Sequence, residues 1–247
     1  MAGTRVELAV VDGAAWITLE GPRTRNALDQ SAAAELIAVC DDIDADPGVG
    51  VAVMTGADPA FCSGADTAVL DRLRSARADD MYDALDTLYA AFRRFGAMTV
   101  PTVAAVNGAA VGAGFNLALA ADLRIASEDA TFVSGFATIG MHPGGGHLHL
   151  LDRAGGMRLA AAAGVFARPV TAAHAVATGL AWAAVPKHEL RPAVTESIAH
   201  LAADPELARA LAATLRRTVS DPATWDRAVE IERARQMWSL SRPRKES

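Results

Sequence analysis

The pattern of apolar and polar residues in this 247-residue chain changes near Val185. Before that point, short apolar runs alternate with longer segments of helical periodicity, whereas only helical segments follow it. Strands are predicted over residues 6–11, 15–20, 49–55, 100–106, 123–126 and 131–133. Helices are predicted over residues 29–44, 79–95, 115–121, 145–153, 157–165, 172–178, 189–203, 205–218 and 225–240. Strands that alternate with helices indicate an α/β core, here with a C-terminal helical region.

Two glycine clusters interrupt the pattern, at residues 108–114 and 144–146. Glycine is favoured where the backbone turns sharply or approaches another group closely, so both clusters suggest a ligand held by main-chain groups. Neither cluster has the GxGxxG spacing of a dinucleotide site, and the chain contains no GxxxxGK[ST] or GxSxG motif.

The first cluster opens a predicted helix near Ala113, whose first N–H groups lack partners within the helix and attract negative charge. The turn Ser63-Gly64-Ala65-Asp66 follows another apolar strand. A free N–H from that turn and one from the helix start would together form an oxyanion hole. The alternative is that both turns are only tight connections between a strand and a helix, and the sequence leaves this open.

Composition narrows the function classes. Apolar residues make up 51% of the chain and charged residues 21%, and the net charge is −6, which argues against nonspecific nucleic-acid binding. The one cationic cluster, over residues 242–245, is interpreted as a solvated end. Cys40 and Cys62 form no CxxC pair, so we expect no metal site and reduced thiols. No signal peptide or membrane span is recognisable, and a cytoplasmic soluble protein is predicted.

Five stretches together resemble the enoyl-CoA hydratase/isomerase (crotonase) superfamily, in order and at the family's spacing. The resemblance extends from about Val6 to Val185 and rests on these stretches: Arg25-Asn26-Ala27-Leu28, Ala60 to Asp66, Val103 to Gly108, Ala120 to Ala126, and Ile139 to Gly146. It implies a spiral of ββα turns over residues 1–185, which would carry the acyl-CoA site. It also implies a helical region over 186–247 that assembles homotrimers, often as dimers of trimers.

The resemblance further implies a coenzyme A thioester as substrate, with no cofactor bound permanently, and a place in fatty acid metabolism. The thioester oxygen would be held by the N–H groups of Ala65 and Ala113, which match the family's donors. Contacts with the coenzyme would come from Arg25, Ala27, Ser63, Gly64, Asp66 and Thr67. The pocket would be lined by Phe115, Phe136 and Gly144.

The sequence departs from the family at two positions. Asn116 stands where hydratases have their first glutamate, and Phe136 stands where they have the second. An asparagine orients a water molecule but takes no proton at neutral pH, and phenylalanine has no proton chemistry. His142 and His147 are therefore candidate acids or bases, because histidine titrates near neutral pH. The alternative is that His142 is a hydrogen-bonded loop residue and His147 a surface residue in a helix cap.

Three hypotheses remain open at this point. The first is an acyl-CoA enzyme with non-hydratase chemistry, such as decarboxylation, thioester hydrolysis or C–C cleavage, that is, a lyase, isomerase or hydrolase. The second is an acyl-CoA binding protein that has lost catalysis. The third is a hydratase or isomerase whose acid and base residues are displaced. No membrane or nucleic-acid partner is expected under any of them.

Overall fold

Two β-sheets form the centre of the structure, a computed structural model that describes residues 3–219 and 222–242. Apart from Arg242, the predicted solvated tail at residues 242–245 lies outside these ranges. In order across the first sheet, the strands are β1 (Arg5–Val11), β2 (Ala14–Glu20), β3 (Val51–Gly56), β5 (Thr102–Val106), β7 (Leu123–Ser127) and β10 (Ala183–Val185). Those of the second are β4 (Ala60–Cys62), β6 (Ala109–Val111), β8 (Thr131–Val133) and β9 (Val170–Thr171).

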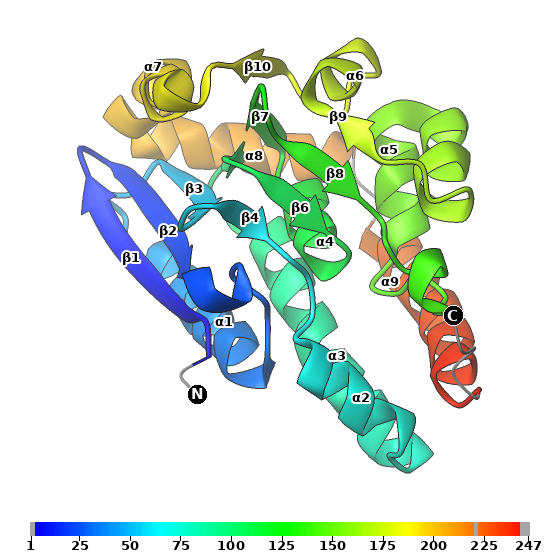
Figure 1. Ribbon diagram of the computed structural model, residues 1–247. Coiled ribbons are helices and arrows are strands. Elements are labelled where there is room, and N and C mark those ends of the chain that lie inside the picture. The colour runs from blue at the N-terminus through cyan, green and yellow to red at the C-terminus, as the bar shows by residue number, and fades with distance from the viewer. Residues whose placement is uncertain (1–2, 220–221, 243–247) are drawn as a thin grey trace.

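The helices connect and cover these sheets (Figure 1). They are α1 (Gln30–Ala45), α2 (Thr67–Arg74), α3 (Ala78–Gly96), α4 (Ala113–Ala120), α5 (His147–Leu159), α6 (Ala172–Ala177), α7 (Leu190–Ala203), α8 (Pro205–Val219) and α9 (Pro222–Leu240). Helix α1 begins as predicted, since the Asp29 carboxylate accepts a hydrogen bond from the Ala32 N–H. The non-helical backbone of Gly155 and Gly156 interrupts α5 between the two helices predicted at 145–153 and 157–165.

The chain repeats one ββα unit three times, as β3-β4 with α2 and α3, β5-β6-α4 and β7-β8-α5. In each unit the first strand joins the first sheet and the second strand joins the second sheet. The repeats pair in parallel, β3 with β5 and β5 with β7, and likewise β4 with β6 and β6 with β8. This spiral of ββα units confirms the α/β fold class expected from the sequence.

The repeat brings the candidate segments together. Strands β4, β6 and β8 are neighbours that run in the same direction, so their carboxyl ends lie at one edge of the second sheet. At these ends the chain continues into the turn Ser63–Asp66, into Gly112 and α4, and into Ser134–Phe136. Segments separated by more than 20 residues in the sequence thereby face one region.

Helix α4 is the centre of the core, with all eight of its residues buried. Helix α7 packs on the first sheet: its Leu190, Val194 and Ile198 belong to a cluster with Val51 and Val53 of β3. Helix α9 lies against α3 and α5 (Figure 1). In the described part of the chain no strand follows Val185, as predicted, whereas the division at residue 185 and a trimer-forming role for residues 186–247 stay predictions.

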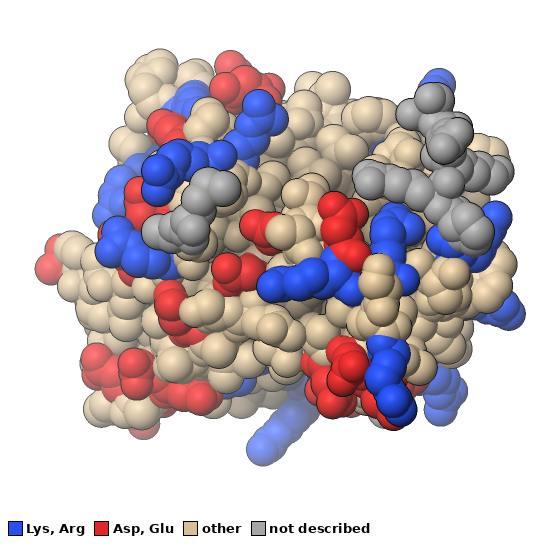
Figure 2. All heavy atoms as spheres, turned by 60° about the horizontal axis from the view of Figure 1, so that its bottom comes forward, with Lys and Arg blue, Asp and Glu red and all other residues tan. Residues whose placement is uncertain are grey.

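Strands β4, β6, β9 and β10 and helix α2 were not expected from the sequence. The strands have only two or three residues each, too few for a recognisable alternation, and α2 is a polar segment. None of the described helices combines the length and apolar character needed to cross a membrane. Figure 2 shows Lys, Arg, Asp and Glu side chains intermingled over the face that it presents, without a broad area of one sign.

Candidate functional site

The turn after β4 lies directly against the start of α4. Gly64 has a φ of +102°, and a Cβ on it would lie 2.8 Å from the Val111 carbonyl oxygen and 3.6 Å from the Ala113 nitrogen. A side chain there would therefore push the two segments apart, and the contact requires glycine. Ala113 is the first residue of α4, where an N–H has no partner within the helix. Among the described residues, neither the Ala65 N–H nor the Ala113 N–H donates to a protein acceptor.

The loop before α1 is tied to the same turn. Arg25 and Asn26 both have left-handed backbone, with φ of +53° and +60°, which costs energy in residues other than glycine. The buried Asn26 side chain holds this conformation, since it accepts from the Gly21 N–H at 2.9 Å and donates to the Ala60 carbonyl at 2.8 Å. The Ser63 N–H in turn donates to the Arg25 carbonyl at 2.9 Å.

These bonds bring together the residues expected to contact coenzyme A, namely Arg25, Ala27, Ser63, Gly64, Asp66 and Thr67. Arg25 and Thr67 are exposed, so the guanidinium of Arg25 is accessible to an anionic group. The Asp66 carboxylate accepts from the Ala68 N–H at 2.7 Å and caps α2, which gives this residue a structural function. None of these contacts tests coenzyme binding, which stays a prediction.

Three side chains form a buried hydrogen-bonded array where α4, β8 and α5 meet. Nδ1 of His147 lies 2.6 Å from Asn116 Oδ1, and Nε2 of the same ring lies 2.7 Å from Ser134 Oγ. His147 has no exposed surface, Asn116 is 1% exposed and Ser134 is 2% exposed. The alternative that His147 is a surface residue is therefore wrong, and α5 begins at this residue, two positions after the predicted start.

The hydrogen bonds fix the tautomer of His147. The Asn116 Nδ2 group donates to the Gly144 carbonyl at 2.8 Å, so Oδ1 is the atom that faces the imidazole. Nδ1 of His147 must then carry the proton and donate it to Asn116, which leaves Nε2 to accept from the Ser134 hydroxyl. Every polar atom of the Asn116 side chain and of the imidazole is thereby used inside the protein.

Aromatic rings enclose the imidazole. The ring centroids of Phe115 and Phe136 lie 5.4 and 5.1 Å from that of His147. This burial lowers the pKa of His147 to about 3, because an imidazolium would lose its hydration there. The Phe136 ring also reaches the start of α4, with Cζ 3.7 Å from the position that a Cβ on Gly112 would take. The neutral imidazole of His147 thus lies between the phenyl rings of Phe115 and Phe136. The match of Asn116 and Phe136 to the two glutamate positions of hydratases stays a prediction.

The second glycine cluster packs against the protein itself. A Cβ on Gly144 would collide with the side chains of Tyr89 and Gln236, and one on Gly146 would collide with Trp225. The backbone of this cluster therefore does approach other groups closely, as predicted. The groups that it approaches are side chains of α3 and α9. Gly144 as a pocket residue stays a prediction.

His142 lies in the loop before this cluster and is half-buried. Its N–H donates to Ser239 Oγ at 2.9 Å, and its Nδ1 donates to the Pro143 carbonyl at 2.7 Å. These contacts match the alternative of a hydrogen-bonded loop residue, and an acid–base role for His142 stays a prediction.

Two residues of this region were not singled out from the sequence. Ser134 gave no signal because a single serine after a strand has many uses. Glu232 on α9 is 4% exposed, and its carboxylate oxygens accept from the N–H groups of His147 and Leu148. The only available signal was the helical spacing of Glu232 with the buried Val229 and Gln236, which does not tell an inward acid from an exposed one.

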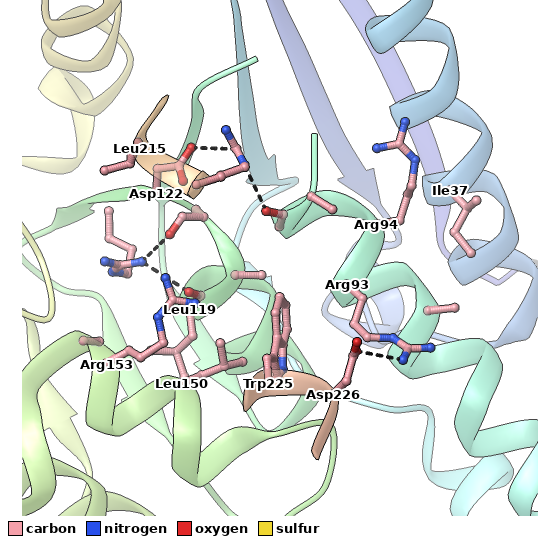
Figure 3. A pocket seen from close by; sticks show the side chains of 18 residues that line it. Ile37, Arg93, Arg94, Leu119, Asp122, Leu150, Arg153, Leu215, Trp225 and Asp226 are labelled. Carbon is pink, nitrogen blue, oxygen red and sulfur yellow. Dashed lines mark hydrogen bonds and ion pairs between the residues drawn. The ribbon is translucent and has the colours of Figure 1, made fainter. Parts of the chain in front are cut away.

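A cavity of about 780 Å³ lies elsewhere, around the carboxyl end of α4 (Figure 3). Its arginines are engaged with the protein: Arg93 pairs with Asp226 at 3.2 Å, Arg216 with Asp122 at 3.1 Å, and Arg124 donates to the Ala121 carbonyl at 2.7 Å. Two of these arginines are thus paired with aspartates, and the third donates to a backbone carbonyl. Within the described ranges no cluster of His, Cys, Asp and Glu could hold a metal ion.

Comparison with known proteins identifies relatives that match most of the chain. The family model described as enoyl-CoA hydratase/isomerase matches residues 10–244. A protein of Mycobacterium tuberculosis named probable enoyl-CoA hydratase EchA14 is 42% identical over 215 residues, which are 87% of this chain and 82% of that protein. The 1,2-epoxyphenylacetyl-CoA isomerase of Escherichia coli is 29% identical over 79% of this chain and 75% of its own length.

Solved structures of enoyl-CoA hydratases have the same fold as this chain. The crystal structure of an enoyl-CoA hydratase from Mycobacterium avium subsp. paratuberculosis superimposes with a TM-score of 0.82 at 28% identity and covers 96% of this chain and 94% of its own. The enoyl-CoA hydratase from Bacillus halodurans gives a TM-score of 0.87 at 23% identity over 96% of this chain and 95% of its own, a likeness of fold alone.

Proposed function

This chain belongs to the enoyl-CoA hydratase/isomerase family, and we propose that within it the protein holds a CoA thioester carbonyl between the Ala65 and Ala113 N–H groups but does not hydrate enoyl thioesters by two glutamates. The observation that carries this proposal is the neutral array of Asn116, His147 and Ser134, covered by Phe136, where glutamates would act.

The proposed oxyanion hole is supported by two free amides on adjoining segments. Gly64 brings its turn to 3.6 Å from the Ala113 nitrogen, measured from an ideal Cβ, and both amides lack protein acceptors among the described residues. Donors placed in advance stabilise the negative charge that develops on a thioester oxygen in the transition state. Loss of one such donor typically slows a reaction by about 10² to 10³.

Of the reactions open to this family, we favour one that forms an enolate without a protein base. The low pKa of His147 makes its imidazole a weak base, and its Nε2 is already engaged with Ser134. Asn116 takes no proton at neutral pH, so neither residue removes a proton from substrate. In the decarboxylation of a 2-carboxyacyl-CoA, the electrons of the C–C bond move toward the thioester carbonyl as CO₂ leaves. The enolate held by the amides then takes a proton from water. Apolar rings such as Phe136 would also remove hydration from the leaving carboxylate.

Two other functions are the alternatives that the experiment must distinguish from decarboxylation. An acyl-CoA binding protein without catalysis is favoured by the internal use of every polar atom in the array. A hydratase or isomerase with displaced residues is favoured by the names of the relatives.

An acyl-CoA panel with mass spectrometry decides between them. We expect a 2-carboxyacyl-CoA to lose CO₂ and crotonyl-CoA to remain unhydrated. Thioesters that bind but come back unchanged would support the binding protein, and full crotonyl-CoA hydration would refute our interpretation of Asn116 and Phe136.

We also propose that the protein assembles as a homotrimer or a dimer of trimers. The support is the set of large apolar side chains that are exposed in the single chain, among them Leu207 and Leu211 of α8 at 54% and 52%. Light scattering on the purified protein tests this, and a monomer at micromolar concentration would contradict it. The cytoplasmic location and the absence of a permanently bound cofactor stay predictions.

A further inference from the structure

The loop that leads into His147 rests on the C-terminal helix α9. The indole Nε1 of Trp225 donates to the Gly145 carbonyl at 3.1 Å, and Ser239 Oγ accepts from the His142 N–H at 2.9 Å. Gln236 accepts a hydrogen bond from the Tyr89 hydroxyl of α3. A helix about 80 residues away in the sequence therefore forms one wall of this loop.

Glu232 makes the central contact of this wall. Its Oε2 accepts from the His147 N–H at 2.7 Å and its Oε1 from the Leu148 N–H at 2.9 Å. The preceding residue Gly146 has no side chain that could cap α5, and its φ of +78° requires glycine. A carboxylate at a helix start satisfies free N–H groups and interacts favourably with the helix dipole, so α9 supplies the cap that the local sequence lacks.

We propose that Glu232 is a positioning residue for the site, which fixes the backbone from which the His147 ring reaches Asn116 and Ser134. The imidazole begins at the residue whose N–H the carboxylate holds, and it in turn orients the Asn116 side chain on α4. Movement of α5 by about 1 Å away from these partners would break the bonds of 2.6 and 2.7 Å at the ring. The inference concerns the site of the proposed function, but it is tested without turnover.

The groups that face Glu232 define how it responds to pH. At the start of α5 they are the backbone N–H groups of Gly146, His147 and Leu148, and on α3 it is Tyr89. Arg233 of α9 is paired with Asp86 and with the exposed Glu230. Burial raises the pKa of Glu232 to about 7, although the N–H groups that donate to its carboxylate act to lower that pKa. Between pH 6 and 8 the carboxylate therefore gains and loses its proton, whereas His147 with its low pKa does not.

Nitrogen-15 NMR of the His147 ring in the full-length protein tests this directly. In the wild type we expect both ring nitrogen signals to shift with a midpoint near pH 7 while they keep the values of a neutral Nδ1–H tautomer. In Glu232→Gln this pH dependence should disappear, because the amide does not titrate. Glu230→Gln, on the same helix but exposed, should retain it.

Signals of His147 that stay constant from pH 6 to 8 in the wild type would overturn the proposal, as would an unchanged titration in folded Glu232→Gln. The measurement on the wild type tests the proposal by itself, so it still decides if Glu232→Gln fails to fold. Glu232→Gln should also weaken acyl-CoA binding, by about tenfold, with Glu230→Gln at the wild-type value. If no acyl-CoA binds to the wild type, the proposed function fails, whereas the NMR result still decides on Glu232.

Discussion

The buried His147 should leave a measurable signature in the pH dependence of stability. Burial lowers its pKa from 6.5 to about 3 in the folded protein. Below pH 6.5 His147 binds a proton in the unfolded chain but not in the folded chain. The stability that depends on neutral His147 is therefore fully present above pH 6.5 and is lost as the pH falls toward 3. At about 1.36 kcal/mol for each unit of difference, His147 alone should cost about 2 kcal/mol between pH 7.5 and 5.0.

Glu232 acts in the opposite direction over the same range. Burial raises its pKa from 4.5 to about 7, so the folded chain holds a proton that the unfolded chain has released. The stabilisation that protonated Glu232 gives the folded protein is present below pH 4.5 and is lost as the pH rises through 7. On going from pH 7.5 to 5.0, Glu232 should therefore raise the free energy of unfolding by about 2 kcal/mol. The two effects should nearly cancel in the wild type.

Single variants separate the two. Urea unfolding followed by tryptophan fluorescence gives the free energy of unfolding of the wild type, His147→Gln and Glu232→Gln at each pH, and the difference from wild type removes all other titrating groups. From pH 7.5 to 5.0, His147→Gln should gain about 2 kcal/mol relative to the wild type, and Glu232→Gln should lose about as much. A difference that does not change with pH for either variant would refute the assignment of that residue.

The packing of the core gives two further predictions, both measured by urea unfolding. Gly114→Ala should cost more than about 3 kcal/mol, because its Cβ would lie 2.2 Å from the backbone oxygen of Cys62 and backbone cannot yield. Gly140→Ala, which meets open space but has a positive φ, is the control at about 1–2 kcal/mol, and equal costs would contradict the predicted clash. Tyr89→Phe should cost about 1–2 kcal/mol, because Gln236 loses its buried donor, and wild-type stability would show that this bond contributes nothing.

The sequence predicted those parts of the structure that local chemistry determines. The Asp29 cap of α1, the helix that begins near Ala113 and the extended segment at residues 131–133 depend on neighbours in the sequence, and all are present. The three-residue strands β4 and β6 depend on pairing with distant strands, so their residues carry no pattern of their own.

The candidate site residues were predicted from motifs, whereas the contacts among them were not predictable. The motifs placed Asn116 and Phe136 in one region, whereas the burial of His147 depends on rings from other elements and on α9. A helix that turns Glu232 and Gln236 inward has the same periodicity as one that exposes them. Only the three-dimensional arrangement distinguishes these cases, because the partner residues are more than 80 positions apart.

The shared edge of β4, β6 and β8 suggests how such a site can change over evolutionary time. Two of these strands lead into the main-chain amides of Ala65 and Ala113, which persist whatever side chains surround them. The side chains proposed to decide the chemistry, those of Asn116 and Phe136, lie on α4 and after β8. A point mutation can therefore replace the reactive group while the part that would hold the thioester is inherited intact. On this scaffold, new chemistry requires no new architecture.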